Sequence, residues 1–203
     1  MPSRIALILL AAGGSTRMGV CKQLLPFRGQ PLVRHAATTA LATNLPVTVV
    51  LGDQAHACRD ALAGLDLSIV VNPFWQRGMG TSLRAGIEHT LANDPLTSAI
   101  LIHLSDQPFV TSQNLLALLQ AHETTQRPLI VAEYNNTIGP PAFIAEPYLT
   151  RLRQSTHDQG GAKPLLNAAP PEDLHKIPLP QAQYDLDTPE DYNTLQAAKP
   201  SHQ

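Results

Sequence analysis

Five short apolar segments, separated by stretches with helical spacing, constrain the fold of this chain more than any other feature of its sequence. Each segment is rich in Ile, Leu and Val and is bounded by turn-forming residues, as buried β-strands are. Strands that alternate with helices form a mostly parallel sheet, and right-handed crossovers place the helices on both faces. We therefore predict a three-layer α/β fold. The predicted strands are residues 5–10, 45–51, 67–71, 98–104 and 128–134.

The alternation of strands and helices ends after residue 134. Residues 135–141 have the composition of a polar turn, residues 142–145 that of a short extended piece, and residues 174–179 that of one more strand. No internal repeat or long linker divides the chain, so we predict one domain over residues 1–203. The predicted helices are residues 31–43, 54–63, 83–91, 111–124, 146–154, 162–169 and 189–198.

A run of very small residues follows the first predicted strand. Small residues allow backbone N–H groups to approach a ligand, and successive N–H groups in a turn suit an anion. Arg17 and Lys22 add positive charge shortly afterwards. This pattern favours polyphosphate binding, and an ordinary Gly-rich turn is the alternative. Neither G-x-G-x-x-G nor the P-loop pattern G-x-x-x-x-G-K-[ST] fits the stretch. The run consists of Ala11, Ala12, Gly13, Gly14 and Ser15.

The composition limits the partners that the chain can have. Its 43% of hydrophobic and 15% of charged residues are typical of a globular protein. A net charge of −2 predicts neither a nucleic-acid partner nor an anionic membrane partner. No apolar stretch reaches the roughly 18 residues of a membrane span, and no secretory signal is recognised, so we expect a cytoplasmic protein. Cys21 and Cys58 have no metal-ligand or disulfide-framework spacing, and His103 is expected to be a packed residue.

Several motifs resemble those of one enzyme superfamily. The stretch from Leu10 to Lys22 matches every named position of the nucleotidyltransferase signature L-A-[AG]-G-x-S-x-R-M-G-x-x-K. Three later motifs match as well, namely W-x-x-G-M-x-x-S-L-x-x-G from Trp75, D-x-P from Asp106 and D-x-D-T-P-E-D from Asp185. Within the superfamily the chain most resembles the molybdenum cofactor cytidylyltransferases, which are related to the guanylyltransferases of molybdopterin-guanine dinucleotide synthesis. The resemblance implies a Rossmann-like, glycosyltransferase-A-like form of the predicted fold and an enzyme that transfers nucleotidyl groups.

A divalent cation is expected where the motif loops meet. Ligands of open α/β sheets bind beyond the carboxyl ends of the strands, and this rule brings together residues 11–22, 78–82 and 105–108. Asp106 in the last loop is a carboxylate beside a predicted polyphosphate, which implies a hard cation such as Mg²⁺.

A second carboxylate for this cation comes from the acidic segment near the end of the sequence. Asp185 and Asp187 project to one face of an extended segment, so either can complete the metal site. Alternatively, Asp187 or Thr188 only caps the last helix. Thr81 or Ser82 is a similar capping candidate for the helix predicted at residues 83–91.

The resemblance implies a role for each motif residue. Lys22 would stabilise charge at the α-phosphate, Arg17 would hold the β- and γ-phosphates, and Asp106 would act with Mg²⁺, so these three are the expected catalytic residues. The expected metal ligands are Asp106, Asp185 and Asp187. The expected nucleotide-binding residues are Leu10, Ala11, Ala12, Gly13, Gly14, Ser15, Arg17, Lys22, Gly80, Ser82 and Asp106.

The substrates are suggested by finer features of the resemblance. Cytidylyltransferases tend to carry L-A-A-G where guanylyltransferases carry L-A-G-G, and a methyl group at Ala12 would narrow the base pocket, so CTP is favoured over GTP. Molybdopterin is the expected acceptor and a molybdoenzyme a possible recipient of the product. Gly139-Pro140-Pro141 and Gln159 depart from the usual pattern and leave a sugar phosphate or methylerythritol phosphate as alternative acceptors. A non-catalytic cofactor-delivery protein and an NAD-dependent Rossmann enzyme are the alternatives from other classes.

Overall fold

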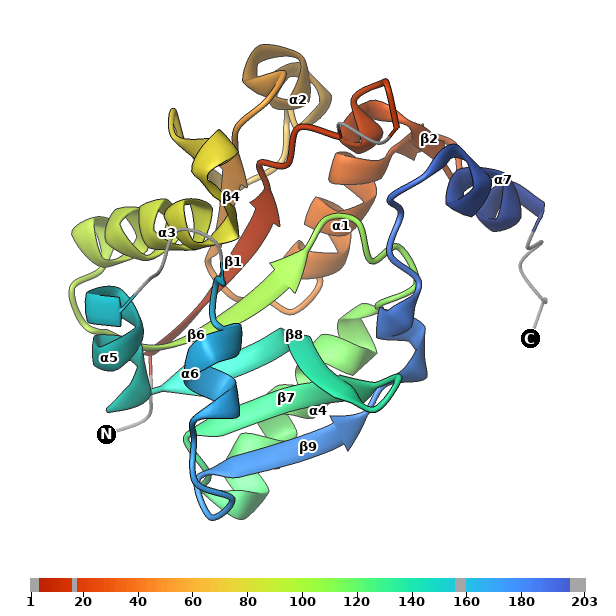
Figure 1. Ribbon diagram of the computed structural model, residues 1–203. Helices are drawn as coiled ribbons and strands as arrows, with labels where there is room; N and C mark the ends of the chain where they lie inside the picture. Colours follow the sequence, from red (N-terminus) through yellow and green to blue (C-terminus); the bar gives the residue numbers. More distant parts are fainter. Residues whose placement is uncertain (1–3, 16–17, 156–159, 198–203) are drawn as a thin grey trace.

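A seven-stranded sheet forms the centre of the protein (Figure 1). The computed structural model describes residues 4–15, 18–155 and 160–197. In this sheet β8 runs antiparallel to both of its neighbours, and the other strand pairs are parallel. The predicted mostly parallel sheet is therefore confirmed. In spatial order the strands are β5 (Ser68–Val71), β4 (Val47–Leu51), β1 (Arg4–Ala11), β6 (Thr97–Leu104), β8 (Thr137–Ala145), β7 (Leu129–Tyr134) and β9 (Leu174–Pro178).

Helices cover both faces of the sheet, as the sequence predicts. On one face lie α1 (Leu32–Leu41), α2 (Ala55–Ala61) and α4 (Ser112–Thr125), and on the other α3 (Met79–Asn93), α5 (Tyr148–Ser155) and α6 (Lys163–Asn167). The alternation of side chains along β1 creates the two cores: Leu7 and Leu9 pack on the first face, Ile8 and Leu10 on the second. Burial on both faces explains why this strand is an unbroken apolar run.

Shorter elements surround the end of the sheet where the motif loops lie. Strands β2 (Pro26–Phe27) and β3 (Gln30–Pro31) form a hairpin, which the two-residue turn Arg28-Gly29 closes. Both turn residues have positive φ angles (50° and 81°), as type I′ turns require. Phe27 and Leu186 belong to a small apolar cluster that holds the hairpin against the C-terminal segment. The remaining elements are η1 (Lys22–Leu24), η2 (Trp75–Arg77), η3 (Pro180–Gln183) and α7 (Pro189–Ala197).

The segment predicted as a polar turn at residues 135–141 is largely a strand, which corrects the prediction. β8 begins at Thr137 and pairs with both β6 and β7. Its ladder with β7 shifts register between Val131 and Ala132, whose partners are Ala142 and Gly139. Pro140 and Pro141 lie within this irregularity. A proline cannot donate a ladder hydrogen bond, so a bulge is where a strand accommodates it.

One predicted helix start changes, and a second helix starts where it is predicted, at Pro189. The helix predicted to begin at residue 83 begins at Met79, and its N-cap is Gly78, whose φ of 125° favours glycine. Thr81 and Ser82 lie inside the first turn and do not cap it. At α7 the cap is Thr188: its Oγ1 accepts from the Asp191 N–H, and the Asp191 carboxylate accepts from the Thr188 N–H. The alternative in which Asp187 serves only as this cap is therefore wrong.

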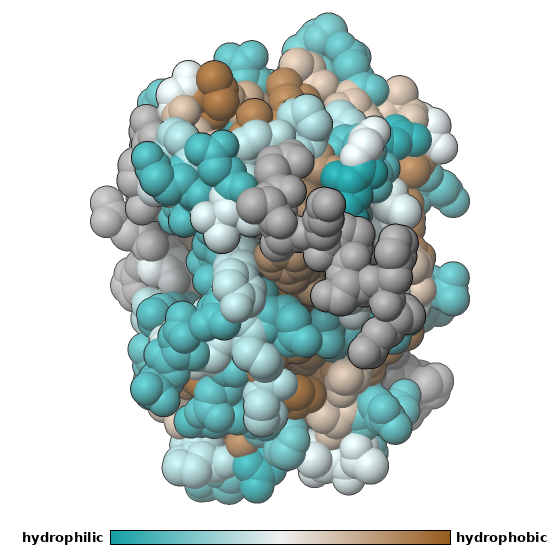
Figure 2. Space-filling model, turned by 90° about the vertical axis from the view of Figure 1, so that its right-hand side faces the viewer, coloured by the Kyte–Doolittle hydropathy of each residue, from teal (hydrophilic) through white to brown (hydrophobic). Residues whose placement is uncertain are grey.

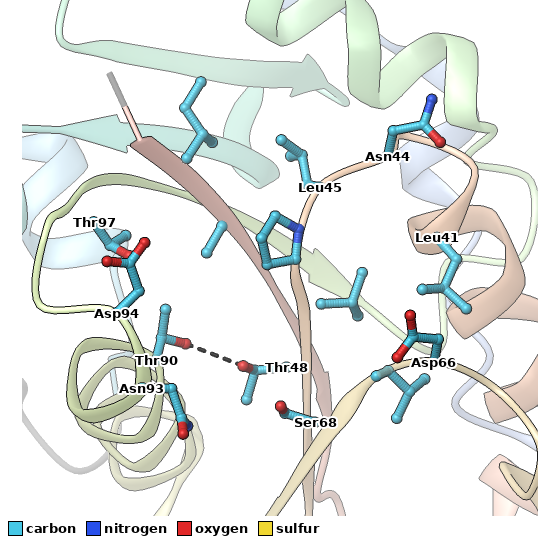
Figure 3. A pocket seen from close by; sticks show the side chains of 15 residues that line it. Leu41, Asn44, Leu45, Thr48, Asp66, Ser68, Thr90, Asn93, Asp94 and Thr97 are labelled. Carbon is cyan, nitrogen blue, oxygen red and sulfur yellow. Dashed lines mark hydrogen bonds between the residues drawn. The ribbon is translucent and has the colours of Figure 1, made fainter. Parts of the chain in front are cut away.

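A cavity of about 630 Å³ lies at the amino ends of the strands (Figure 3). The first residues of β1, β4, β5 and β6 line it, and Thr90 Oγ1 donates to Thr48 Oγ1 across it at 3.2 Å. Because ligands of open α/β sheets bind at the opposite edge, this cavity is not the candidate site.

One face of the surface and the apolarity of the described helices bear on whether the chain contains a membrane-spanning helix. The face in Figure 2 is mostly hydrophilic, with its apolar atoms in small separate areas. None of the helices in residues 4–15, 18–155 and 160–197 combines the length and the apolarity needed to cross a bilayer.

His103, near the carboxyl end of β6, predicts an acid-sensitive fold. The side chain is fully buried, and neither ring nitrogen has a hydrogen-bond partner among the described residues. Burial, with a smaller effect of His35, lowers the pKa of His103 to about 3. Between this value and the ordinary pKa near 6.5, the unfolded chain binds a proton that the folded chain does not. The free energy of unfolding should therefore fall with pH below about 6.5, by about 1.4 kcal/mol per pH unit from this residue.

Urea melts between pH 7 and pH 5 measure this slope. His103→Leu should flatten it, whereas His56→Gln, at a side chain that is 93% exposed, should leave it unchanged. An equal slope in His103→Leu and the unaltered protein would contradict the prediction.

Candidate functional site

A cavity of about 470 Å³ lies beyond the carboxyl ends of β1 and β6. The glycine-rich loop forms one wall, the start of α3 and η2 form a second, and the loop after β6 together with the acidic C-terminal segment forms a third. The three motif loops therefore meet at the edge of the sheet where they are expected. The lining residues are Leu10, Ala11, Ala12, Gly13, Gly14, Lys22, Gln23, Trp75, Gln76, Gly78, Met79, Ser82, Leu104, Ser105, Asp106, Asp185 and Asp187.

Lys22 joins the first loop to two distant carboxylates. Its Nζ donates to Asp106 Oδ2 at 2.6 Å and to Asp187 Oδ1 at 2.9 Å. The Lys22 side chain is only 10% exposed. Burial lowers the pKa of Lys22, but Asp106 and then Asp187 outweigh it, so the pKa lies above its ordinary value. Lys22 therefore carries a full charge and fixes the positions of both carboxylates.

Asp185 is a third carboxylate in the same cavity. Burial raises its pKa to about 7, and the nearby charges of Asp106 and Asp187 add to the effect. Among the described residues, three acidic groups and one cation, Lys22, thus line this cavity. This excess of negative charge is a favourable environment for an added cation.

The residues present fit a magnesium ion that is completed by its substrate. Asp106 Oδ1 is buried and has no hydrogen-bond partner in the described part of the chain, so it is available to a cation. No three His, Cys, Asp or Glu side chains in that part are gathered closely enough to enclose a metal ion by themselves. Mg²⁺ usually binds one or two carboxylates together with phosphate oxygens and water. A site of two carboxylates open to a polyphosphate meets this description.

The buried side chain of Gln23 stabilises the conformation of the glycine-rich loop. Gln23 is buried, and its Nε2 donates to the Gly13 carbonyl at 2.8 Å. Its Oε1 accepts from Ser15 Oγ at 3.2 Å, and Ser15 Oγ accepts from the Lys22 N–H at 3.0 Å. Ser15 is therefore used inside the loop and does not line the cavity, although it is one of the expected nucleotide contacts.

Trp75 packs directly on the glycine-rich loop. A Cβ atom added to Gly14 would lie 2.3 Å from the Trp75 ring, and one added to Gly52 would lie 2.4 Å from the Ala12 carbonyl oxygen. Only glycine fits at these two positions. Asn72 fastens the segment of Trp75 to α3, because its Nδ2 donates to Thr81 Oγ1 at 2.8 Å and to Ser82 Oγ at 3.0 Å.

Apart from Ser15, the expected site residues fall into three groups: those that line the cavity, one that does not line it, and one outside the described residues. Leu10, Ala11, Ala12, Gly13, Gly14, Lys22, Ser82, Asp106, Asp185 and Asp187 line the cavity. Gly80 is buried in the first turn of α3 and does not line it. Arg17 lies outside the described residues. Gln23 and Asn72 are not marked by any sequence pattern, because an amide that holds a loop has no characteristic spacing.

A second cavity of about 520 Å³ adjoins the first on the side of β8 and α6. Met79 and Leu104 line both cavities, and most of the other lining residues are apolar. Gly139 and Pro140, where the sequence departs from the usual pattern, lie in this lining. The full set is Met79, Leu104, Tyr134, Thr137, Ile138, Gly139, Pro140, Gly160, Ala162, Lys163, Pro164, Leu166 and Asn167.

Comparison with known proteins agrees with the fold and with the motifs. Over 120 residues the chain is 42% identical to nicotine blue oxidoreductase of Paenarthrobacter nicotinovorans, covering 57% of this chain and 55% of that protein. It is 26% identical over 212 residues to the purine catabolism protein PucB of Bacillus subtilis (strain 168), covering 94% and 95%. The crystal structure of Rv0371c from Mycobacterium tuberculosis H37Rv superposes with a TM-score of 0.81 at 25% identity, covering 98% of this chain and all of that one.

The comparison with a protein family gives the assignment. The alignment with the first relative spans only about half of that protein, so its activity is not transferred with the similarity. The family described as the MobA-like NTP transferase domain matches residues 7–174 of this chain, which include the glycine-rich loop and Asp106. The chain therefore belongs to the family of MobA-like NTP transferase domains.

Proposed function

We propose that this protein transfers a nucleotidyl group from a nucleoside triphosphate to a phosphorylated small molecule and releases pyrophosphate. One observation carries the proposal: the buried Lys22 ammonium lies between Asp106 and Asp187, beside the glycine-rich backbone, in one cavity. A cation and an exposed backbone suit phosphates, and the carboxylates suit the metal ion that accompanies them. Membership of a family of NTP transferase domains supports the same reaction.

The chemistry requires little from the protein beyond position and charge. An oxygen of the acceptor phosphate forms a bond to the α-phosphorus, and the bond from that phosphorus to the oxygen bridging to the β-phosphate breaks. An acceptor phosphate is already nucleophilic, so no general base is needed. Lys22 would stabilise the charge that develops at the α-phosphate, and Arg17 would hold the β- and γ-phosphates. The backbone of residues 12–15 would cradle the nucleotide.

A magnesium ion would be held by Asp106 and by Asp185 or Asp187 together with phosphate oxygens. Bound there, it would neutralise phosphate charge and orient the two substrates. Since Asp187 is engaged with Lys22 and Asp185 is not, Asp185 is the stronger candidate for the second ligand. Rv0371c has been crystallised with manganese, so a divalent ion is compatible with this fold.

CTP is the favoured nucleotide and molybdopterin the favoured acceptor. Ala12 is one of the residues that line the nucleotide cavity. A methyl group at this position would leave less room for a purine than glycine would, which makes GTP the second choice. The adjoining cavity beside β8 would hold the acceptor. Because Gly139 and Pro140 in its wall depart from the usual pattern, a sugar phosphate or methylerythritol phosphate is the alternative acceptor. A molybdoenzyme would then receive a molybdopterin product.

An oxidoreductase is the second candidate, and one observation favours it. The relative with 42% identity over 120 residues is named nicotine blue oxidoreductase. Hydride transfer would require a nicotinamide dinucleotide, whose phosphates would suit the same charged cavity. The absence of G-x-G-x-x-G from the glycine-rich loop speaks against it.

A nucleotide panel separates these functions. The protein is mixed with Mg²⁺, molybdopterin and either CTP, GTP, ATP or UTP, and pyrophosphate is measured; reduced nicotinamide dinucleotides are tested in parallel by absorbance. We expect pyrophosphate release, fastest with CTP. Calorimetric binding of nucleotide without pyrophosphate release from any acceptor would indicate a delivery protein. Oxidation of a nicotinamide dinucleotide would indicate the second candidate.

A further inference from the structure

Gln107 connects three segments that meet behind the charged cluster. It follows Asp106 in the loop after β6, and its side chain is 1% exposed. Its Nε2 donates to the Ala182 carbonyl in η3 at 2.9 Å and to the Pro140 carbonyl in β8 at 3.2 Å. Both amide protons therefore fasten segments that are 75 and 33 positions away in the sequence.

These contacts bracket Asp185. On one side, Ala182 is fixed to Gln107; on the other, the Leu186 N–H donates to the Asp106 carbonyl at 3.0 Å. Two neighbouring residues of one loop thus hold the chain just before and just after Asp185.

The acceptor atom of Gln107 indicates why an amide is present. Its Oε1 is buried and has no hydrogen-bond partner in the described part of the chain. An unpaired buried acceptor destabilises a fold, so the contribution of this side chain lies in what its donors hold in place.

We propose that Gln107 is a positioning residue that holds the Asp185 carboxylate beside Asp106 for metal binding. The inference rests on the proposed function, because it assigns Asp185 to the magnesium ion. Pro140 also lines the adjoining cavity. The same amide therefore connects the wall of the proposed acceptor cavity, at Pro140, to the segment that carries Asp185, through Ala182.

The test measures metal binding directly rather than turnover. Mn²⁺ is titrated into the protein with a non-hydrolysable CTP analogue, and free Mn²⁺ is followed by electron paramagnetic resonance. Gln107→Leu should weaken Mn²⁺ binding by about 10- to 100-fold, the range found when residues that orient metal ligands are replaced. Gln120→Leu, an exposed glutamine of α4, is the matched control and should bind as the unaltered protein does.

A double-mutant cycle separates positioning from general support of the fold. If Gln107 acts through Asp185, Gln107→Leu should cause no further loss of Mn²⁺ affinity in an Asp185→Asn background. An undiminished further loss there, or normal Mn²⁺ affinity of folded Gln107→Leu, would overturn the inference. If Gln107→Leu does not fold, Gln107→Asn keeps the amide but is one methylene too short to reach both carbonyls. The Mn²⁺ affinity of Gln107→Asn should be lower than that of the unaltered protein. An affinity equal to that of the unaltered protein would likewise overturn the inference.

The two proposals fail in different ways. Absence of Mn²⁺ binding to the unaltered protein with nucleotide would overturn the proposed function and this inference together. Normal Mn²⁺ binding and pyrophosphate release by the unaltered protein, with no effect of Gln107→Leu, would overturn the inference alone.

Discussion

Replacing Lys22 by alanine is expected to slow turnover by about 10²–10³-fold, the effect of removing one preorganised electrostatic stabiliser. Lys22 is buried and fully charged, and its position is fixed by Asp106 and Asp187. A charge held in this way requires no reorganisation when negative charge develops at the α-phosphate. In the alanine variant, water and the remaining groups would have to supply that stabilisation.

The measurement is steady-state release of pyrophosphate with CTP, Mg²⁺ and acceptor. The loss should appear in kcat as well as in kcat/KM, because the interaction strengthens in the transition state. Lys176→Ala is the control, since Lys176 also pairs with a carboxylate, Glu133 at 2.9 Å, but on the exposed surface of the sheet edge. Near-normal turnover of Lys22→Ala would remove Lys22 from the mechanism.

Asp106→Asn is expected to lose Mg²⁺-dependent activity, by at least about 10²-fold, while the fold stays intact. The amide has almost the same shape but no charge, so it cannot replace the carboxylate as a ligand of a hard cation. The fold should tolerate the change because the crowding of Asp106, Asp185 and Asp187 is relieved. The charge of Asp106 is one of the causes that raise the pKa of Asp185.

A titration of activity with Mg²⁺, together with thermal melts, checks this expectation. Asp60→Asn is the matched control, at an exposed carboxylate of α2. An Mg²⁺ titration curve that is unchanged in Asp106→Asn would show that the metal ion binds elsewhere.

The parts of the fold that depend on local pattern could be predicted from the sequence. The apolar run of β1 fixes a strand buried on both faces, and the alternation with helices fixes a mostly parallel sheet. The second half of β8 agrees with the extended piece predicted at residues 142–145, but its first half does not follow from the sequence, because Gly139-Pro140-Pro141 is a turn signal by composition. Only the register shift against β7 allows a strand to contain it. Local sequence carries no information about such an irregularity in a neighbouring strand.

The same distinction applies to the candidate site. Lys22, Asp106 and Asp185 stand in recognisable motifs, and the rule for the carboxyl ends of parallel strands brings their loops together. The side-chain amides of Gln23 and Gln107 donate to backbone carbonyls elsewhere in the chain. Any residue type presents such a carbonyl, so nothing in the sequence marks the partners of these amides.

The acidic segment after β9 gives the site a particular order of assembly. Lys22 and Asp187 are 165 positions apart in the sequence, so during translation the ribosome releases the glycine-rich loop long before it releases the carboxylates that pair with Lys22. A nascent chain can fold its first strands around that loop while the charge cluster is still missing a wall. On the proposed function, the enzyme becomes able to consume nucleotide only after the segment that contains Asp187 has been synthesised and has folded against Lys22.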